Sequence, residues 1–230
     1  MSRITAVDIE SLATPENAGY GIVIPNFAFV LVPDTPVTDH LEYLYVQMPV
    51  QEQLDAGLKT GASTMDFWHN MCAKEYPNAH AEMIKSFTLT NPKIHTNARF
   101  ISSEASYIPY VIKQFVYGNP YGLDENVVPH VYGNGCHFDC SILQENMRVQ
   151  YGDGSLWHYS SPDNARTLKR LLDGEHREEM DEMVAPVLAA FVRNMEGQGI
   201  GTLELHHPLY DAAREALQIS YCLNVLKQIA

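Results

Sequence analysis

The pattern that most restricts the fold of this chain is the helical spacing of its C-terminal third. Apolar side chains recur every three or four residues between Glu175 and Met195, which is the spacing of one helix face. Pro186 interrupts this stretch, so we expect a kink or a join between two helices there. Residues 208–228 read as a closing helix with a broad apolar face. This part of the chain is therefore predicted to be helical.

A third helix is predicted just before these two. Ser161-Pro162-Asp163 combines a capping residue, a proline suited to the first helical position and an acidic residue in the first turn. We expect this helix to run to about Asp173, where Gly174 can end it.

Strands are expected in the N-terminal part and in the middle of the chain. Residues 1–18 are polar, and β-rich runs follow at 20–24, 27–32 and 41–48. Short helices are expected at 50–58, 63–75 and 79–87. Residues 136–159 read as a β-meander with a tight turn at Gly152-Asp153-Gly154, and residues 202–206 as a short strand.

Together these segments predict an α+β fold with an N-terminal β region, central helices, a β-meander around 136–159 and C-terminal helices. The chain has 230 residues, of which 46% are apolar, and this is enough for one substantial core. No shift in composition marks a boundary, so residues 1–230 are expected to form a single compact domain.

Charge and cysteine content restrict the classes of function. The 28 acidic and 15 basic residues give a formal charge of −13, so we expect neither nucleic-acid binding nor attachment to an anionic membrane. The densest basic stretch, Arg166 to Arg170, reads as a solvated helix face. Four cysteines in a chain without an export signal are expected to be reduced thiols in the cytoplasm. The low charged fraction of 19% favours a homo-oligomer that hides part of its surface.

Candidate chemistry centres on Cys136-His137-Phe138-Asp139-Cys140. On a strand, alternate residues share a face, so His137 and Asp139 would stand side by side. They would then supply two of the three ligands of a facial triad for non-haem iron. The third ligand is expected from the segment Glu204-Leu205-His206-His207, in which Glu204 is a further ligand or orients an imidazole.

The order of these residues resembles a known family. His137-x-Asp139, a distal histidine about seventy residues later and then Arg214 follow the order of the iron- and 2-oxoglutarate-dependent oxygenases. In that family the basic residue after the distal histidine binds the carboxylate of the co-substrate, so the resemblance implies this role for Arg214. The helical character of residues 163–195 departs from the strands that separate the ligands in the family.

The leading hypothesis is a small-molecule enzyme with one divalent metal ion, with Fe(II) favoured, that acts as an oxidoreductase or oxygenase. Its predicted metal ligands are His137, Asp139, His206 and His207, and its predicted catalytic residues are Glu204 and Arg214. Tyrosines concentrated before residue 137 are expected to line a pocket for a small organic ligand.

Three other interpretations stay open. One is a non-catalytic protein that binds a small molecule or assembles as a homo-oligomer. Another is a metal-free enzyme with Cys/His acid–base chemistry, for example Cys72 with His69. The third is a di-metal site on the acidic helix around His176 and Glu179, where a solvated charged face is the favoured interpretation.

Overall fold

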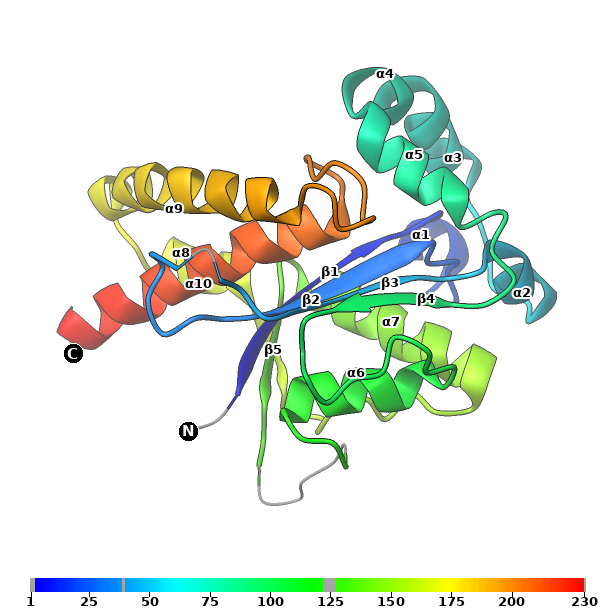
Figure 1. The fold of residues 1–230 in the computed structure, drawn as a ribbon, viewed down its shortest axis with the longest axis horizontal. Coiled ribbons are helices and arrows are strands. Elements are labelled where there is room, and N and C mark those ends of the chain that lie inside the picture. Colours follow the sequence, from blue (N-terminus) through cyan, green and yellow to red (C-terminus); the bar gives the residue numbers. More distant parts are fainter. Residues whose placement is uncertain (1–2, 39, 122–126, 230) are drawn as a thin grey trace.

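A mixed β-sheet forms the centre of the molecule. The computed structural model describes residues 3–38, 40–121 and 127–229. Within them, six strands pair in the order β4-β3-β2-β1-β5-β6 (Figure 1). The strands are β1 (Ile4–Glu10), β2 (Asn26–Leu31), β3 (Tyr43–Gln47), β4 (Lys93–Thr96), β5 (His130–Gly133) and β6 (Pro162–Asn164).

Strand pairing in the sheet changes from antiparallel to parallel at β1. Strands β1 to β4 form an antiparallel meander, in which Glu10 pairs with Asn26. On its other side β1 pairs in parallel with β5, and β5 pairs in parallel with β6. Parallel strands end at the same edge of a sheet. The segments that follow β1 and β5 therefore leave the sheet close together, although they are far apart in the sequence.

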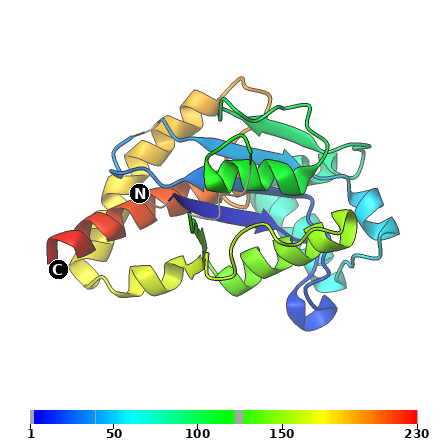
Figure 2. The ribbon, with the colours of Figure 1, turned by 90° about the horizontal axis from the view of Figure 1, so that it is seen from below.

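Helices cover both faces of the sheet. Figure 1 shows α9 and α10 on one face and α6 and α7 on the other, and Figure 2 shows α6 and α7 from below. The helices are α1 (Pro15–Ala18), α2 (Val50–Asp55), α3 (Ala62–Asp66), the π-helix η1 (Phe67–Cys72), α4 (Ala73–Glu75), α5 (Pro77–Lys85), α6 (Ile108–Tyr117), α7 (Cys136–Tyr151), α8 (Ala165–Arg170), α9 (Gly174–Met195) and α10 (Pro208–Ile229). In the described part of the chain, no helix is both long and apolar enough to cross a membrane.

Each face of the sheet has its own apolar core. Val7 and Ile9 of β1 pack with residues of α6 and α7, whereas Ala6 packs with residues of α9 and α10. This division follows from the two-residue period of a strand. It matters for the site, because Asp8 and Glu10 share the face of Ala6.

The predicted α+β class is confirmed, with an N-terminal β region, central helices and C-terminal helices. The predicted β-meander at 136–159 is wrong, because α7 occupies residues 136–151. Cys140, Leu143 and Met147 are buried at intervals of three and four residues, which is a helical period. Gly152 ends α7 in a left-handed conformation (φ 72°), so the glycine interpreted as a hairpin turn follows the last turn of a helix.

Smaller differences occur at four other places. The polar N-terminal segment contains the central strand β1, which the sequence reading missed. The predicted strand at 202–206 is not formed, and residues 162–164 form β6, so that Asn164 and not Ser161 caps the following helix α8. Helix α9 continues through Pro186 from residue 174 to residue 195.

Candidate functional site: a carboxylate pocket

A pocket of about 450 Å³ lies where β1 ends, between the N-termini of α7 and α10. Its polar lining contains five carboxylates, one imidazole and two guanidinium groups, besides Asn134. These charged and ionisable residues are Asp8, Glu10, Asp139, Asp211, Glu215, His206, Arg166 and Arg214. Such a density of carboxylates in one partly buried space makes this pocket the candidate site.

Strand β1 supplies two of the carboxylates. Asp8 and Glu10 are two residues apart, so both project from the α10 side of the sheet. Burial raises the pKa of Asp8 well above its ordinary value, and the charges of Asp211 and Glu10 raise it further. Burial likewise raises the pKa of Glu10, with added repulsion from Asp211 and Asp139. The two side chains are therefore held in a space that disfavours their negative charge.

Helix α7 supplies a third carboxylate from its first turn. The backbone N–H of Gly135 donates a hydrogen bond of 3.2 Å to Oδ2 of Asp139. Burial raises the pKa of Asp139 to about 7, and the hydrogen bonds from backbone N–H groups oppose this rise. Gly133 at the end of β5 allows the close approach, because a Cβ atom there would lie 2.7 Å from the same oxygen.

The N-terminus of α10 supplies His206 and Asp211. The backbone N–H of His206 donates a 2.8 Å hydrogen bond to Oδ2 of Asp211. Oδ1 of Asp211 lies 3.0 Å from Nη2 of Arg214, yet this buried oxygen has no hydrogen-bond partner. Burial raises the pKa of Asp211 and lowers that of His206. A buried acceptor without a hydrogen bond is unusual, and a bound cation would satisfy it.

Ligand atoms of three pocket residues are close enough to share a cation. One atom each of Glu10, His206 and Asp211 lies within 4.8 Å of the others. Asp8 and Asp139 line the same pocket and add further carboxylate oxygens. Glu215 is already paired, since its Oε1 lies 3.0 Å from Nζ of Lys169. A donor set dominated by carboxylates suits Mg²⁺, Mn²⁺ or Ca²⁺.

The structure brings together three of the residues predicted from the sequence. Asp139, His206 and Arg214 all line the pocket. His137 does not, because it lies on the exposed side of α7. Two residues apart on a helix are about 200° apart around its axis, so the expected shared face of His137 and Asp139 is wrong.

Glu204 and His207 lie close to the pocket in sequence but make other contacts. The carboxylate of Glu204 accepts hydrogen bonds from the backbone N–H groups of Asn78 and Ala79, at 2.7 and 3.0 Å. The His207 ring is buried with its centroid 4.9 Å from that of Tyr45, and burial lowers its pKa to about 4. Glu204 is therefore bonded to the start of α5, and His207 is part of the core.

Sequence reasoning missed Asp8, Glu10 and Asp211. The available signal was the alternation in residues 4–10, where acidic residues occupy alternate positions after an apolar run. Arg166 was interpreted as a solvated residue, and it is indeed exposed, but it stands at the rim of the pocket. Comparison with known proteins adds no family, since neither the family models nor the curated proteins include a match to this chain.

Proposed function

We propose that this protein is a metal-dependent phosphodiester hydrolase, a nuclease that binds two divalent cations in the carboxylate pocket. The observation that carries the proposal is the convergence of Asp8, Glu10, Asp139 and Asp211. Their mutual repulsion and burial oppose ionisation, and divalent cations remove that penalty. Pairs of divalent ions held by carboxylates are typical of enzymes that cleave phosphate esters.

The chemistry assigns a role to each charged group. The carboxylates would hold the two cations, which would supply positive charge to the attacking and leaving oxygens as water adds to phosphorus. His206, left out of the ligand set in this assignment, accepts the proton of that water, since its lowered pKa keeps the ring neutral near pH 7. Arg166 and Arg214 at the pocket bind the phosphate oxygens. The P–O bond to the leaving group then breaks, the leaving oxygen takes up a proton from solvent water, and the products are a phosphate monoester and a free hydroxyl.

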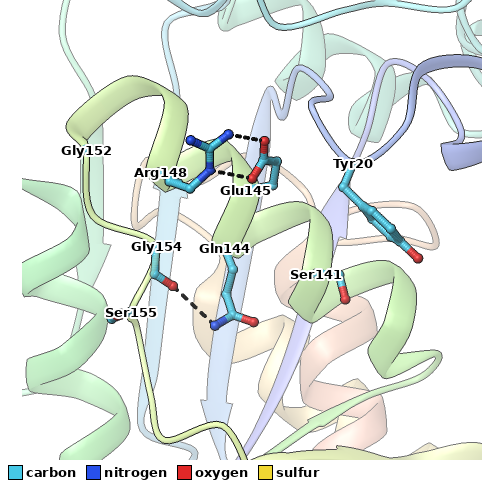
Figure 3. A pocket seen from close by; sticks show the side chains of 8 residues that line it. All are labelled: Tyr20, Ser141, Gln144, Glu145, Arg148, Gly152, Gly154 and Ser155. Atoms are coloured by element: carbon cyan, nitrogen blue, oxygen red, sulfur yellow. Dashed lines mark hydrogen bonds and ion pairs between the residues drawn. The ribbon is translucent and has the colours of Figure 1, made fainter.

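A second hollow favours a polymeric substrate. Helix α7, which carries Asp139 in its first turn, also forms a hollow of about 750 Å³ on its outer side, with Tyr20 on one side and Arg148 on the other (Figure 3). The Tyr20 side chain is 45% exposed, and the Arg148 guanidinium is held by two hydrogen bonds to Glu145. An exposed ring can stack on a base, and a guanidinium can bind a phosphate, so this surface suits a nucleic-acid strand.

The expectation against nucleic acid came from the average charge of the chain. Locally, the basic residues of α8 lie beside the pocket, where Nε of Arg166 is 3.3 Å from Oδ1 of Asn134. Lys169 contacts Glu215 of the same pocket. Three of the fifteen basic residues, Arg166, Lys169 and Arg214, therefore lie at or beside the pocket, and bound metal ions would add further positive charge.

The mononuclear iron enzyme expected from the sequence is less well supported. A facial triad needs two imidazoles and one carboxylate, whereas a single imidazole lines this pocket with five carboxylates. Oxygen donors favour magnesium or manganese over iron.

The test is hydrolysis of end-labelled single-stranded DNA and RNA by the purified chain, with Mg²⁺, Mn²⁺, Fe²⁺ or EDTA. We expect cleavage with Mg²⁺ or Mn²⁺, and a loss of at least about 100-fold in Asp8→Asn, as for damaged metal sites in general. Glu178→Gln on the exposed part of α9 is the matched control and should retain full activity. The proposal fails if no strand is cleaved, if only phosphate monoesters are hydrolysed, or if Asp8→Asn cleaves as fast as the wild type.

A further inference from the structure

The segment that carries His206 has an unusual backbone. Among the described residues, His206 is the one residue other than glycine with a positive φ, at 65°. This conformation costs a residue with a side chain about 1–2 kcal/mol. Upstream, Gly197, Gly199 and Gly201 also have positive φ angles, so the connection from α9 contains three residues with wide conformational freedom. Such a connection does not by itself hold His206 in place.

Three aromatic rings surround the imidazole of His206. The centroid of Tyr76 lies 4.8 Å away, that of Phe67 5.4 Å and that of Trp68 6.4 Å, and all three rings meet it edge to face. Phe67 and Trp68 begin the π-helix η1, and Tyr76 immediately precedes α5. A π-helix is rare and is frequently found at functional sites. This helical segment, inserted between β3 and β4, is thus in direct contact with a residue of the pocket.

Glu204 fastens the His206 segment to the same helices. Its Oε1 accepts hydrogen bonds from the N–H groups of Asn78 and Ala79, and its Oε2 accepts one of 3.0 Å from Nδ2 of Asn78. These N–H groups belong to the first turn of α5, where a negative charge is favourable. Two residues after Glu204, the backbone N–H of His206 donates a hydrogen bond to the carboxylate of Asp211. Two carboxylates, one bonded to α5 and one to His206 itself, thus fix this segment.

We propose that Glu204 is a positioning residue for His206: by capping α5 it holds the imidazole among Phe67, Trp68 and Tyr76 and aimed at the carboxylate pocket. Glu204 does not line the pocket, so it acts through His206 and not on the substrate. The catalytic consequence rests on the proposed function, whereas the structural consequence is independent of it. A displacement of about 1 Å in a reacting group can cost up to about 100-fold in rate.

The first experiment measures the position of the ring without any substrate. NMR of the imidazole protons should show a ring-current shift for His206, which is assigned by its loss in His206→Ala. Glu204→Ala should move this resonance toward the value of a free histidine, and Glu204→Gln, which keeps one acceptor oxygen, should restore part of the shift. Asp173→Ala, which removes the capping carboxylate of α9, is the matched control and should leave the resonance unchanged.

The second experiment is a double-mutant cycle on strand cleavage. Glu204→Ala should lower kcat by about 10- to 100-fold with little change in KM. In the His206→Ala background the same substitution should have little further effect, because its target is already absent. Circular dichroism and thermal unfolding establish that each variant is folded.

The outcomes separate the two proposals. An unchanged His206 resonance in folded Glu204→Ala, or fully additive losses in the cycle, would overturn the positioning role. A displaced resonance in a protein that cleaves no phosphodiester would support the positioning role and overturn the nuclease.

Discussion

An aspartate and a histidine lie at the N-terminus of both α9 and α10, but their pKa values shift in opposite directions at the two helices. At α9, Asp173 accepts a hydrogen bond from the backbone N–H of His176, which lowers the pKa of Asp173, and the side-chain contact between them raises the pKa of His176. At α10, burial raises the pKa of Asp211 and lowers that of His206. Both helix ends are rich in carboxylates, but those of α9 project into solvent.

The opposite pKa shifts follow from the surroundings of the carboxylates at each helix end. The carboxylates of α9 all come from one helix and can spread into water. The carboxylates around the N-terminus of α10 come from β1, α7 and α10, and the fold brings them together in one pocket. Convergence from distant segments, and not the density of acidic residues along the chain, therefore distinguishes the candidate site from a charged surface.

The largest expected effect is on strand cleavage, which should depend on the aspartate of α10 but not on that of α9. Asp211→Asn removes a predicted metal ligand and should lower strand cleavage by at least about 100-fold. Asp173→Asn at the N-cap of α9 should leave kcat and KM unchanged. Steady-state cleavage with Mn²⁺ measures both, and equal losses in the two variants would remove the distinction.

The next effect concerns the pH dependence of stability without metal. Burial raises the pKa of folded Asp139 to about 7, whereas the ordinary pKa of this group is 3.8. Its contribution to stability is therefore fully present below about pH 4 and is lost as the pH rises toward 7. Urea unfolding in EDTA should show this loss, and Asp139→Asn should reduce it, while the raised pKa values of Asp8 and Glu10 leave a remaining dependence of the same sign. Asp173 has the opposite sign, because its lowered pKa gives a contribution that is lost as the pH falls below its ordinary value of 3.8.

A third effect concerns the close approach behind Asp139. Gly133→Ala would place a methyl group 2.7 Å from Oδ2 of Asp139, which should cost about 1–3 kcal/mol and displace the carboxylate. Gly174→Ala is the control at the start of α9, where an added Cβ meets nothing within 4 Å. Chemical unfolding should detect a loss of stability, and Mn²⁺ titration a loss of metal affinity, in Gly133→Ala but not in Gly174→Ala. A Gly133→Ala protein with wild-type stability and metal affinity would contradict the packing described for α7.

The smallest expected effect is the loss of stability when the N-cap side chain of α9 is removed. Asp173→Ala should lower the stability of the protein slightly, because α9 loses its N-cap side chain. Because this helix end is exposed, the destabilisation should shrink at high salt. Thermal unfolding at low and high ionic strength measures it. A change in metal affinity in this variant would show that α9 and the pocket are coupled.

The parts of the fold that sequence could predict are those with one clear period. The stripe of α9 from Met180 to Met195 and the apolar strands β2 and β3 needed no tertiary information. Helix α7 was misread because Asp139 and Asn146 are polar residues on its buried side, so its apolar stripe is interrupted. Strand β1 was missed because Asp8 and Glu10 give its α10-facing side the polar character of a loop. In both elements a polar interruption belongs to the candidate site, namely Asp8 and Glu10 in β1 and Asp139 in α7, so the site residues obscured the structural pattern.

The site was predicted only in part for a related reason. Asp139, His206 and Arg214 were selected from the sequence, but on the assumption of strands that do not form. Their partners on β1 could not be paired with them, because parallel pairing of β1 with β5 joins segments about 125 residues apart. No local pattern contains that information.

The parallel pairing of β1 with β5 also bears on when a newly synthesised chain can form its pocket. The pocket draws on residues 8–10 from one end of the chain and on residues 206–215 near the other, with residue 139 between them. A growing or truncated polypeptide that lacks α10 has no pocket, whatever the state of its sheet. The proposed cleavage activity should therefore appear only once the chain has been made through α10 and that helix has docked onto β1, so chains that end before α10 are expected to be inactive.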